Sequence, residues 1–126
     1  MRSRPANPSA LLRLRRVLAR FEPDIVHVRL FLTQLSPLIL APLRAVPSIW
    51  HVVWYQAICP RGTLLMPDGG DCDHRAGIAC TRSLRAGAWA PAMLQRALLR
   101  GRLDAFTRTI TVSEASRARL AARGVQ

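Results

Sequence analysis

Three short segments rich in β-branched residues, separated by helix-forming segments, constrain the fold of this chain most strongly. The first, residues 24–28 (DIVHV), is short and rich in β-branched apolar residues, which is typical of a strand buried on both faces of a parallel sheet. The second covers residues 48–54 (SIWHVVW) and the third residues 109–112 (TITV). Strands that alternate with helices predict right-handed crossovers and a parallel sheet. The predicted helices cover residues 11–21, 36–45, 92–103 and 114–123.

These helical segments combine an apolar stripe at helical spacing with capping residues at their boundaries. Asn7 followed by Pro8 predicts the start of the first helix, and Pro23 predicts its end. Ser113 is the predicted N-cap of the last helix. The third helix is expected to bury Met93, Leu94, Ala97 and Leu98 and to expose Arg96 and Arg100.

The length and the number of strands predict one incomplete domain. A chain of 126 residues holds one domain of ordinary size, and half of its residues are apolar, which is enough for a core. Three strands are fewer than a doubly wound domain normally has. We therefore predict an α/β fold, a partial Rossmann-like three-layer parallel sheet, in a single domain over residues 1–126. An irregular segment from about 55 to 90 holds five of the seven glycines and all three cysteines, and loops this long are usually functional or disordered.

The charge of the chain indicates which ligands it binds, and its hydropathy indicates the compartment in which it lies. All nineteen basic residues are arginines, against seven acidic residues, and the net charge is +12. Guanidinium groups bind phosphate and carboxylate bidentately, which favours an oxyanion ligand, although the base composition of the gene would explain the same bias. The longest apolar stretch, residues 30–46, is shorter than a membrane span and contains polar residues and prolines. The first 21 residues carry six arginines but lack the apolar core of a secretory signal. We therefore predict a cytoplasmic protein and leave its association with a membrane open.

Two binding functions compete with an enzymatic one. The net charge suggests a nucleic-acid-binding module, but aromatic residues make up only 6% and the arginines are spread along the chain, which argues against nucleic acid. The basic helices at 11–21 and 92–103 could instead rest on an anionic membrane, where each surface arginine contributes about 1 kcal/mol. A solvated basic face explains the same pattern.

Candidate substrate-binding residues follow the predicted strands. In open parallel sheets, ligands bind beyond the carboxyl ends of the strands. Arg29 follows the first strand, Tyr55 and Gln56 follow the second, Ser113 follows the third, and Arg61 lies in the loop after Gln56. The arginines could hold an anionic group, and the other side chains offer neutral hydrogen bonds. Structural roles fit each residue singly, because Ser113 also caps a helix and Arg29 also suits a solvated loop. No catalytic residue is assigned.

Three cysteines and one histidine of the irregular segment are the candidate metal ligands. They are Cys59, Cys72, His74 and Cys80. Three thiolates and one imidazole could form a closed zinc site, but a C-x2-C pair is absent from the sequence and reduced thiols are the default. No metal is therefore predicted. His27 and His51 lie within predicted strands and are expected to be structural.

The segment 55–69 (YQAICPRGTLLMPDG), with the two cysteines after it, resembles family 4 glycosyltransferases. The resemblance is to the amino-terminal, acceptor-side domain of the two-domain retaining enzymes of GT-B type. The run PDIVHV at 23–28 and the Ser36-Pro37 pair match the family pattern in the expected order. The end of the pattern is matched by Val112, Ser113, Arg117, Leu120 and Gly124.

The resemblance implies transfer of a sugar from a nucleotide-sugar to a sugar or lipid-linked acceptor, with retention and without a metal cofactor. It also implies that a second domain or a second chain binds most of the donor, and that a first strand with a Gly-rich loop precedes residue 1. This chain is therefore expected to be inactive alone, as a truncated product or one half of a split enzyme. The family places a histidine just before the aromatic residue that corresponds to Tyr55, where this sequence has Val53 and Trp54 and the nearest histidine is His51.

Overall fold

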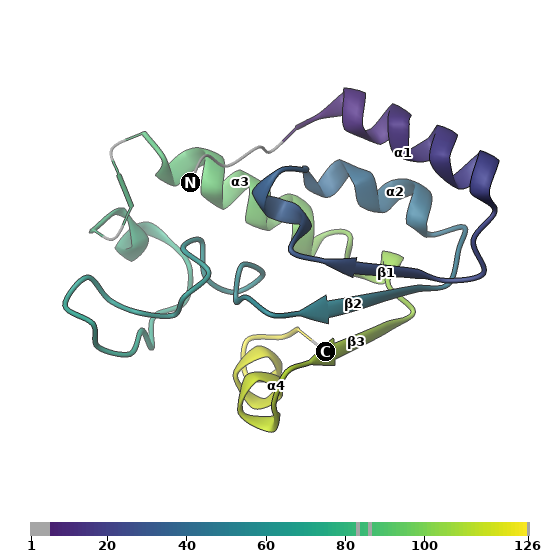
Figure 1. Ribbon diagram of the computed structural model, residues 1–126. Coiled ribbons are helices and arrows are strands. Elements are labelled where there is room, and N and C mark those ends of the chain that lie inside the picture. The colour runs from purple at the N-terminus through teal and green to yellow at the C-terminus, as the bar shows by residue number, and fades with distance from the viewer. Residues whose placement is uncertain (1–5, 83, 86, 126) are drawn as a thin grey trace.

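The chain forms a three-stranded parallel sheet with helices packed along one side (Figure 1). The computed structural model describes residues 6–82, 84–85 and 87–125. Strands β1 (Val26–Arg29), β2 (Ser48–Val52) and β3 (Arg108–Thr111) are adjacent in that order, and both pairs are parallel. The prediction of a partial Rossmann-like α/β fold is confirmed. Arg2 and Arg4, counted in the basic amino-terminal segment, lie outside the described residues.

The register brings the carboxyl ends of all three strands to one edge. Val28 of β1 is level with Trp50 of β2, and Trp50 is level with Thr109 of β3. The residues that follow the three strands therefore leave the sheet from the same side, and this edge is where a parallel sheet places its ligands.

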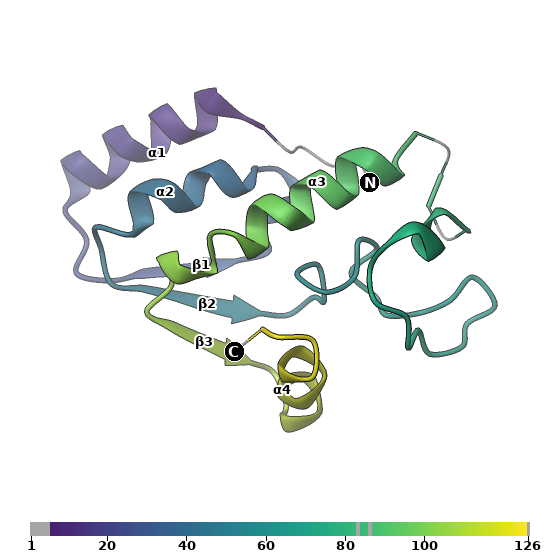
Figure 2. The same ribbon diagram turned by 180° about the vertical axis from the view of Figure 1, so that it is seen from behind.

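The helices are α1 (Pro8–Phe21), α2 (Leu40–Leu43), α3 (Trp89–Arg100) and α4 (Glu114–Ala121). In both views α1, α2 and α3 lie on one side of the strands, and α4 lies beside the end of β3 (Figures 1 and 2). The second helix is shorter than predicted, because Pro37–Ile39 forms a separate 3₁₀ turn before it. Short 3₁₀ turns also occur at Phe31–Thr33, Ile78–Arg82 and Leu103–Ala105.

The predicted helix boundaries of α1 and α4 are confirmed by their caps. The Asn7 side chain accepts a hydrogen bond from the amide of Ala10 at 3.2 Å. The Ser113 hydroxyl accepts one from the amide of Ser116 at 3.1 Å. At the other end of α1, Glu22 adopts a left-handed conformation with φ of 47°. These local signals are readable from sequence because each cap contacts residues three positions away.

The core lies between the sheet and the helices α2 and α3. Val28, Trp50 and Val52 point into it from the sheet. Leu40, Leu43 and Leu99 meet them from the helices. The opposite side of β1 is exposed at His27 and Arg29, so the expectation that β1 is buried on both faces is wrong for the described structure. The reason is that the described helices α1 to α3 all pack on the other face.

The buried face of α3 differs from the prediction. Ala92, Gln95 and Leu99 are buried, whereas the side chain of Leu94 is 51% exposed. These three buried positions follow a spacing of three and four residues, so they form one stripe. The Gln95 amide tolerates burial because its Nε2 donates to the carbonyl of Leu32 at 3.2 Å.

Candidate functional site

A closed loop from Tyr55 to Gly62 follows β2 at the carboxyl edge of the sheet. The amide of Tyr55 donates to the Gly62 carbonyl at 3.0 Å, and the Tyr55 carbonyl accepts from the amide of Cys59 at 2.7 Å. Ile58 is buried beneath the loop, and Gly62 has a φ of +80°. Hydrogen bonds, burial and a left-handed glycine therefore hold Tyr55 and Gln56 at the end of β2.

A chain of hydroxyl groups joins the ends of β2 and β3. The Tyr55 hydroxyl lies 3.2 Å from the Ser116 Oγ, and the Ser113 Oγ lies 3.0 Å from the same atom. Tyr55 follows β2, whereas Ser113 and Ser116 begin α4 after β3. The two strand ends at Tyr55 and Ser113 thus lie close together. Ser116 was missed by the sequence analysis, although Ser-x-x-Ser at a helix start is a spacing that brings two hydroxyls together.

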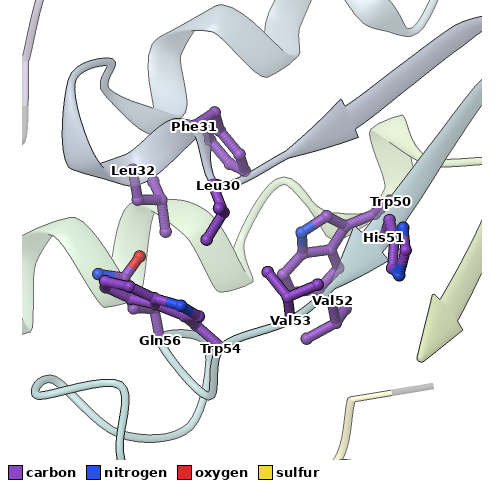
Figure 3. A pocket seen from close by; sticks show the side chains of 9 residues that line it. All are labelled: Leu30, Phe31, Leu32, Trp50, His51, Val52, Val53, Trp54 and Gln56. Carbon is purple, nitrogen blue, oxygen red and sulfur yellow. The ribbon is translucent and has the colours of Figure 1, made fainter. Parts of the chain in front are cut away.

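A small pocket lies between the ends of β1 and β2 (Figure 3). Figure 3 shows Trp54 and Gln56 on the same side of it. Its volume is about 20 Å³, which is room for about one water molecule. The lining is mostly apolar and consists of Leu30, Phe31, Leu32, Trp50, His51, Val52, Val53, Trp54 and Gln56.

The two predicted arginines lie outside this pocket. Arg29 is exposed at the end of β1, and Arg61 is exposed in the loop after β2. Nη1 of Arg61 lies 3.4 Å from the carbonyl of Leu65, a long hydrogen bond that leaves the rest of the guanidinium open to solvent. Of the five candidates, Tyr55 and Ser113 are joined through Ser116, Gln56 lines the pocket, and Arg29 and Arg61 are exposed and do not line it.

An ion pair gives the start of α4 a fixed charge arrangement. The Arg117 Nε donates to the Glu114 Oε2 at 2.9 Å, and this hydrogen bond lowers the pKa of the Glu114 carboxyl. Glu114 directly follows Ser113, so it stays ionised near the edge at neutral pH. A carboxylate in the first turn also stabilises the helix dipole.

The sequence of this parallel α/β domain matches a known protein family. The sequence profile of the glycosyl transferase 4-like domain matches residues 1–126. The chain belongs to this family. No curated protein and no solved structure gives a significant match. The resemblance inferred from residues 55–69 is thereby confirmed over the whole chain.

Two of the three histidines of this glycosyl transferase 4-like domain lie side by side on neighbouring strands. The rings of His27 and His51 stack at 5.4 Å with an interplanar angle of 7°. Both residues belong to strands, and His51 pairs in register with Arg29. The stacking explains why two imidazoles are tolerated side by side on an exposed strand surface.

The described residues of the domain hold no cluster of three or more metal-ligating side chains. This includes the four zinc candidates of the irregular segment, of which Cys59 and Cys80 are buried. The zinc site that the sequence left open is therefore not assembled in this structure. Positions 83 and 86 of that segment lie outside the described residues.

Proposed function

We propose that this glycosyl transferase 4-like domain supplies the acceptor side of a retaining sugar-transfer enzyme. The observation that carries the proposal is the hydroxyl chain of Tyr55, Ser116 and Ser113, which joins two strand ends at the ligand-binding edge. Gln56, next to Tyr55 in the sequence, adds an amide that lines the pocket between the ends of β1 and β2. Hydroxyl and amide groups both donate and accept hydrogen bonds, as the hydroxyls of a sugar require.

The acceptor would lie across this edge and not within the pocket of Figure 3, because that pocket has room for about one water molecule. Arg29 is exposed at the end of β1 and Arg61 in the loop after β2, and their guanidinium groups would bind the phosphate of a lipid-linked acceptor. The second wall of the cleft would come from a donor-binding domain or chain.

The proposed reaction divides its work between these two parts. The bond from the anomeric carbon to the nucleoside diphosphate breaks, and a bond from that carbon to an acceptor hydroxyl forms on the same face. The diphosphate leaves with the bonding electrons, and the proton of the acceptor hydroxyl passes to an oxygen of this leaving group. Charge on the leaving diphosphate needs fixed positive groups, which the donor part would supply. We expect no turnover from the acceptor part alone.

Acceptor binding is tested by amide NMR spectra of the labelled chain, titrated with simple methyl glycosides of glucose, mannose, galactose and N-acetylglucosamine. We expect at least one sugar to shift the signals of Tyr55, Gln56 and Ser113. Tyr55→Phe removes the hydroxyl but keeps the ring, and it should weaken binding about fivefold, since a hydrogen bond contributes about 1 kcal/mol.

Arg44→Gln is the matched control for this titration. Arg44 pairs with Asp104 at 2.8 Å near Pro47 and Thr107, which precede β2 and β3, so it lies at the opposite edge of the sheet. The control should bind sugars as the unchanged chain does. Shifts confined to this opposite edge, or equal binding by Tyr55→Phe, would contradict the proposal.

We further propose that α1 rests on an anionic membrane, which suits a lipid-linked acceptor. Residues Ala10, Leu14 and Leu18 pack against the core, while Phe21 is 77% exposed. The exposed surface of α1 combines apolar and basic side chains and has no acidic residue in the helix. It is formed by Leu12, Arg13, Arg15, Arg16, Val17, Arg20 and Phe21. None of the described helices has the length and apolar character that crossing a membrane requires.

Membrane binding is measured by co-sedimentation with vesicles of phosphatidylcholine alone or with added phosphatidylglycerol. We expect binding only to the anionic vesicles. The Arg13→Gln/Arg16→Gln variant should bind about thirtyfold more weakly, since each surface arginine contributes about 1 kcal/mol. The control Arg82→Gln/Arg108→Gln removes two exposed charges outside α1 and outside the proposed acceptor edge, and it should change binding little. Equal recovery with both vesicle types would refute the membrane contact.

A further inference from the structure

Four arginines line a cavity of about 400 Å³ outside the site described above. Arg75 comes from the irregular segment, Arg96 and Arg100 lie one turn apart on α3, and Arg123 follows α4. The rest of the lining is formed by Ile58, Ala76, Ala122 and Gly124. No acidic side chain is among the described residues that line this arginine cavity.

Backbone carbonyl groups fix two of these arginines in place. Nη1 of Arg100 donates to the carbonyl of Arg123 at 2.9 Å, and Nη2 donates to that of Gly124 at 3.3 Å. Nη2 of Arg123 donates to the carbonyl of Cys72 at 3.1 Å. These acceptors are neutral, so they orient the guanidinium groups without cancelling their charge. Each group keeps further N–H donors.

Arg96 lines the cavity and carries a buried donor of its own. Its Nε is buried and has no hydrogen-bond partner among the described residues. Burial lowers the pKa of Arg96, and the positive charge of Arg100 lowers it further. A buried donor without a partner is unfavourable and rare in folded proteins. An anion in the cavity would relieve the repulsion between the two arginines.

The acidic residues of the described chain do not compensate this charge. The ion pairs found there join Arg44 to Asp104, Arg117 to Glu114 and Arg119 to Asp71. None of them includes an arginine of the cavity. The four guanidinium groups therefore face one cavity with their charges unpaired, in a volume typical of small-molecule sites.

We propose that the arginine cavity binds a phosphate or diphosphate group. The guanidinium fork binds phosphate oxygens bidentately, and several forks around one cavity match a multiply charged anion better than a single carboxylate. The ligand is either a free inorganic anion or a phosphate ester of a larger molecule. The cavity shares Ile58 with the loop at the proposed acceptor edge, but none of the side chains proposed to bind the acceptor, so it stands or falls independently of sugar transfer.

The test is calorimetric titration of the chain with inorganic pyrophosphate at constant ionic strength. We expect saturable binding that Arg96→Gln weakens at least tenfold and Arg75→Gln weakens about fivefold. Arg108→Gln removes an exposed charge on β3 and should change the affinity less than twofold. Absence of saturable binding, or equal weakening by Arg108→Gln, would overturn the proposal, because the effect would then be one of net charge.

Two further measurements keep the result interpretable. Thermal denaturation without ligand should show Arg96→Gln melting no lower than the unchanged chain, because the substitution removes a partly buried charge next to Arg100. If Arg96→Gln melts much lower and Arg75→Gln binds normally, the proposal fails.

Titration with uridine diphosphate and with glycerol phosphate then distinguishes an organic phosphate from a free inorganic anion as the ligand. Tighter binding of either ester than of pyrophosphate supports an organic phosphate, and the reverse order supports the free anion.

Discussion

Replacing Leu99 by alanine is expected to lower the free energy of unfolding by about 3 kcal/mol. Leu99 is 0% exposed and lies in the core cluster with Trp50, Leu40 and Leu43. Removing its branched side chain costs transfer free energy and leaves a cavity where α3 meets the sheet. Urea denaturation followed by circular dichroism measures the change, and an unchanged slope of free energy against urea would show that the unfolded state is unaffected.

Leu94→Ala is the matched control, because it makes the same chemical change on the same helix. Leu94 is 51% exposed, so its substitution should cost less than about 1 kcal/mol. The pair tests which face of α3 is buried. Equal losses in the two variants, or a larger loss for Leu94→Ala, would mean that the helix packs by the face predicted from its sequence and not by the face seen in the structure.

The strands and the outer helix boundaries could be predicted because their signals are local. Residues 48–52 are β-branched or aromatic at most positions, and they form β2. Asn7 and Ser113 cap the helices that follow them. The orientation of α3 depends instead on contacts with distant segments, such as the hydrogen bond from the Gln95 side chain to the carbonyl of Leu32 across 63 positions of sequence. Helical periodicity carries no such information.

Some residues of the candidate sites could likewise be predicted from the sequence, and others could not. Tyr55, Gln56 and Ser113 could be chosen because strand ends in a parallel sheet meet at one edge, and Tyr55 and Ser113 are joined there through Ser116. The arginine cavity could not be predicted, since helical spacing assigned Arg96 and Arg100 to a solvent-facing surface. Arg100 reaches the carbonyl of Arg123, which follows it by 23 positions, and only the folded chain shows this contact.

The closed loop after β2 leads to the second large effect, which is expected from Gly62→Ala at about 3 kcal/mol of lost stability. Gly62 has a φ of +80°, which is strained for any residue with a Cβ atom. The new Cβ atom would also lie 3.0 Å from the Cγ of Gln56 and 3.3 Å from the Cε3 of Trp54. Both side chains line the pocket at the strand ends, so the substitution should weaken sugar binding at the edge as well.

Gly69→Ala separates backbone strain from the steric clash. Gly69 has a φ of +89°, but a Cβ atom there would meet nothing within 4 Å. It should therefore cost only the strain of a left-handed residue, about 1 kcal/mol, and should leave the Tyr55 and Gln56 amide signals unshifted. If Gly62→Ala costs no more than Gly69→Ala, the side chains of Gln56 and Trp54 are free to move aside. A wall that yields in this way cannot orient an acceptor, and the proposed role of Gln56 would then be lost.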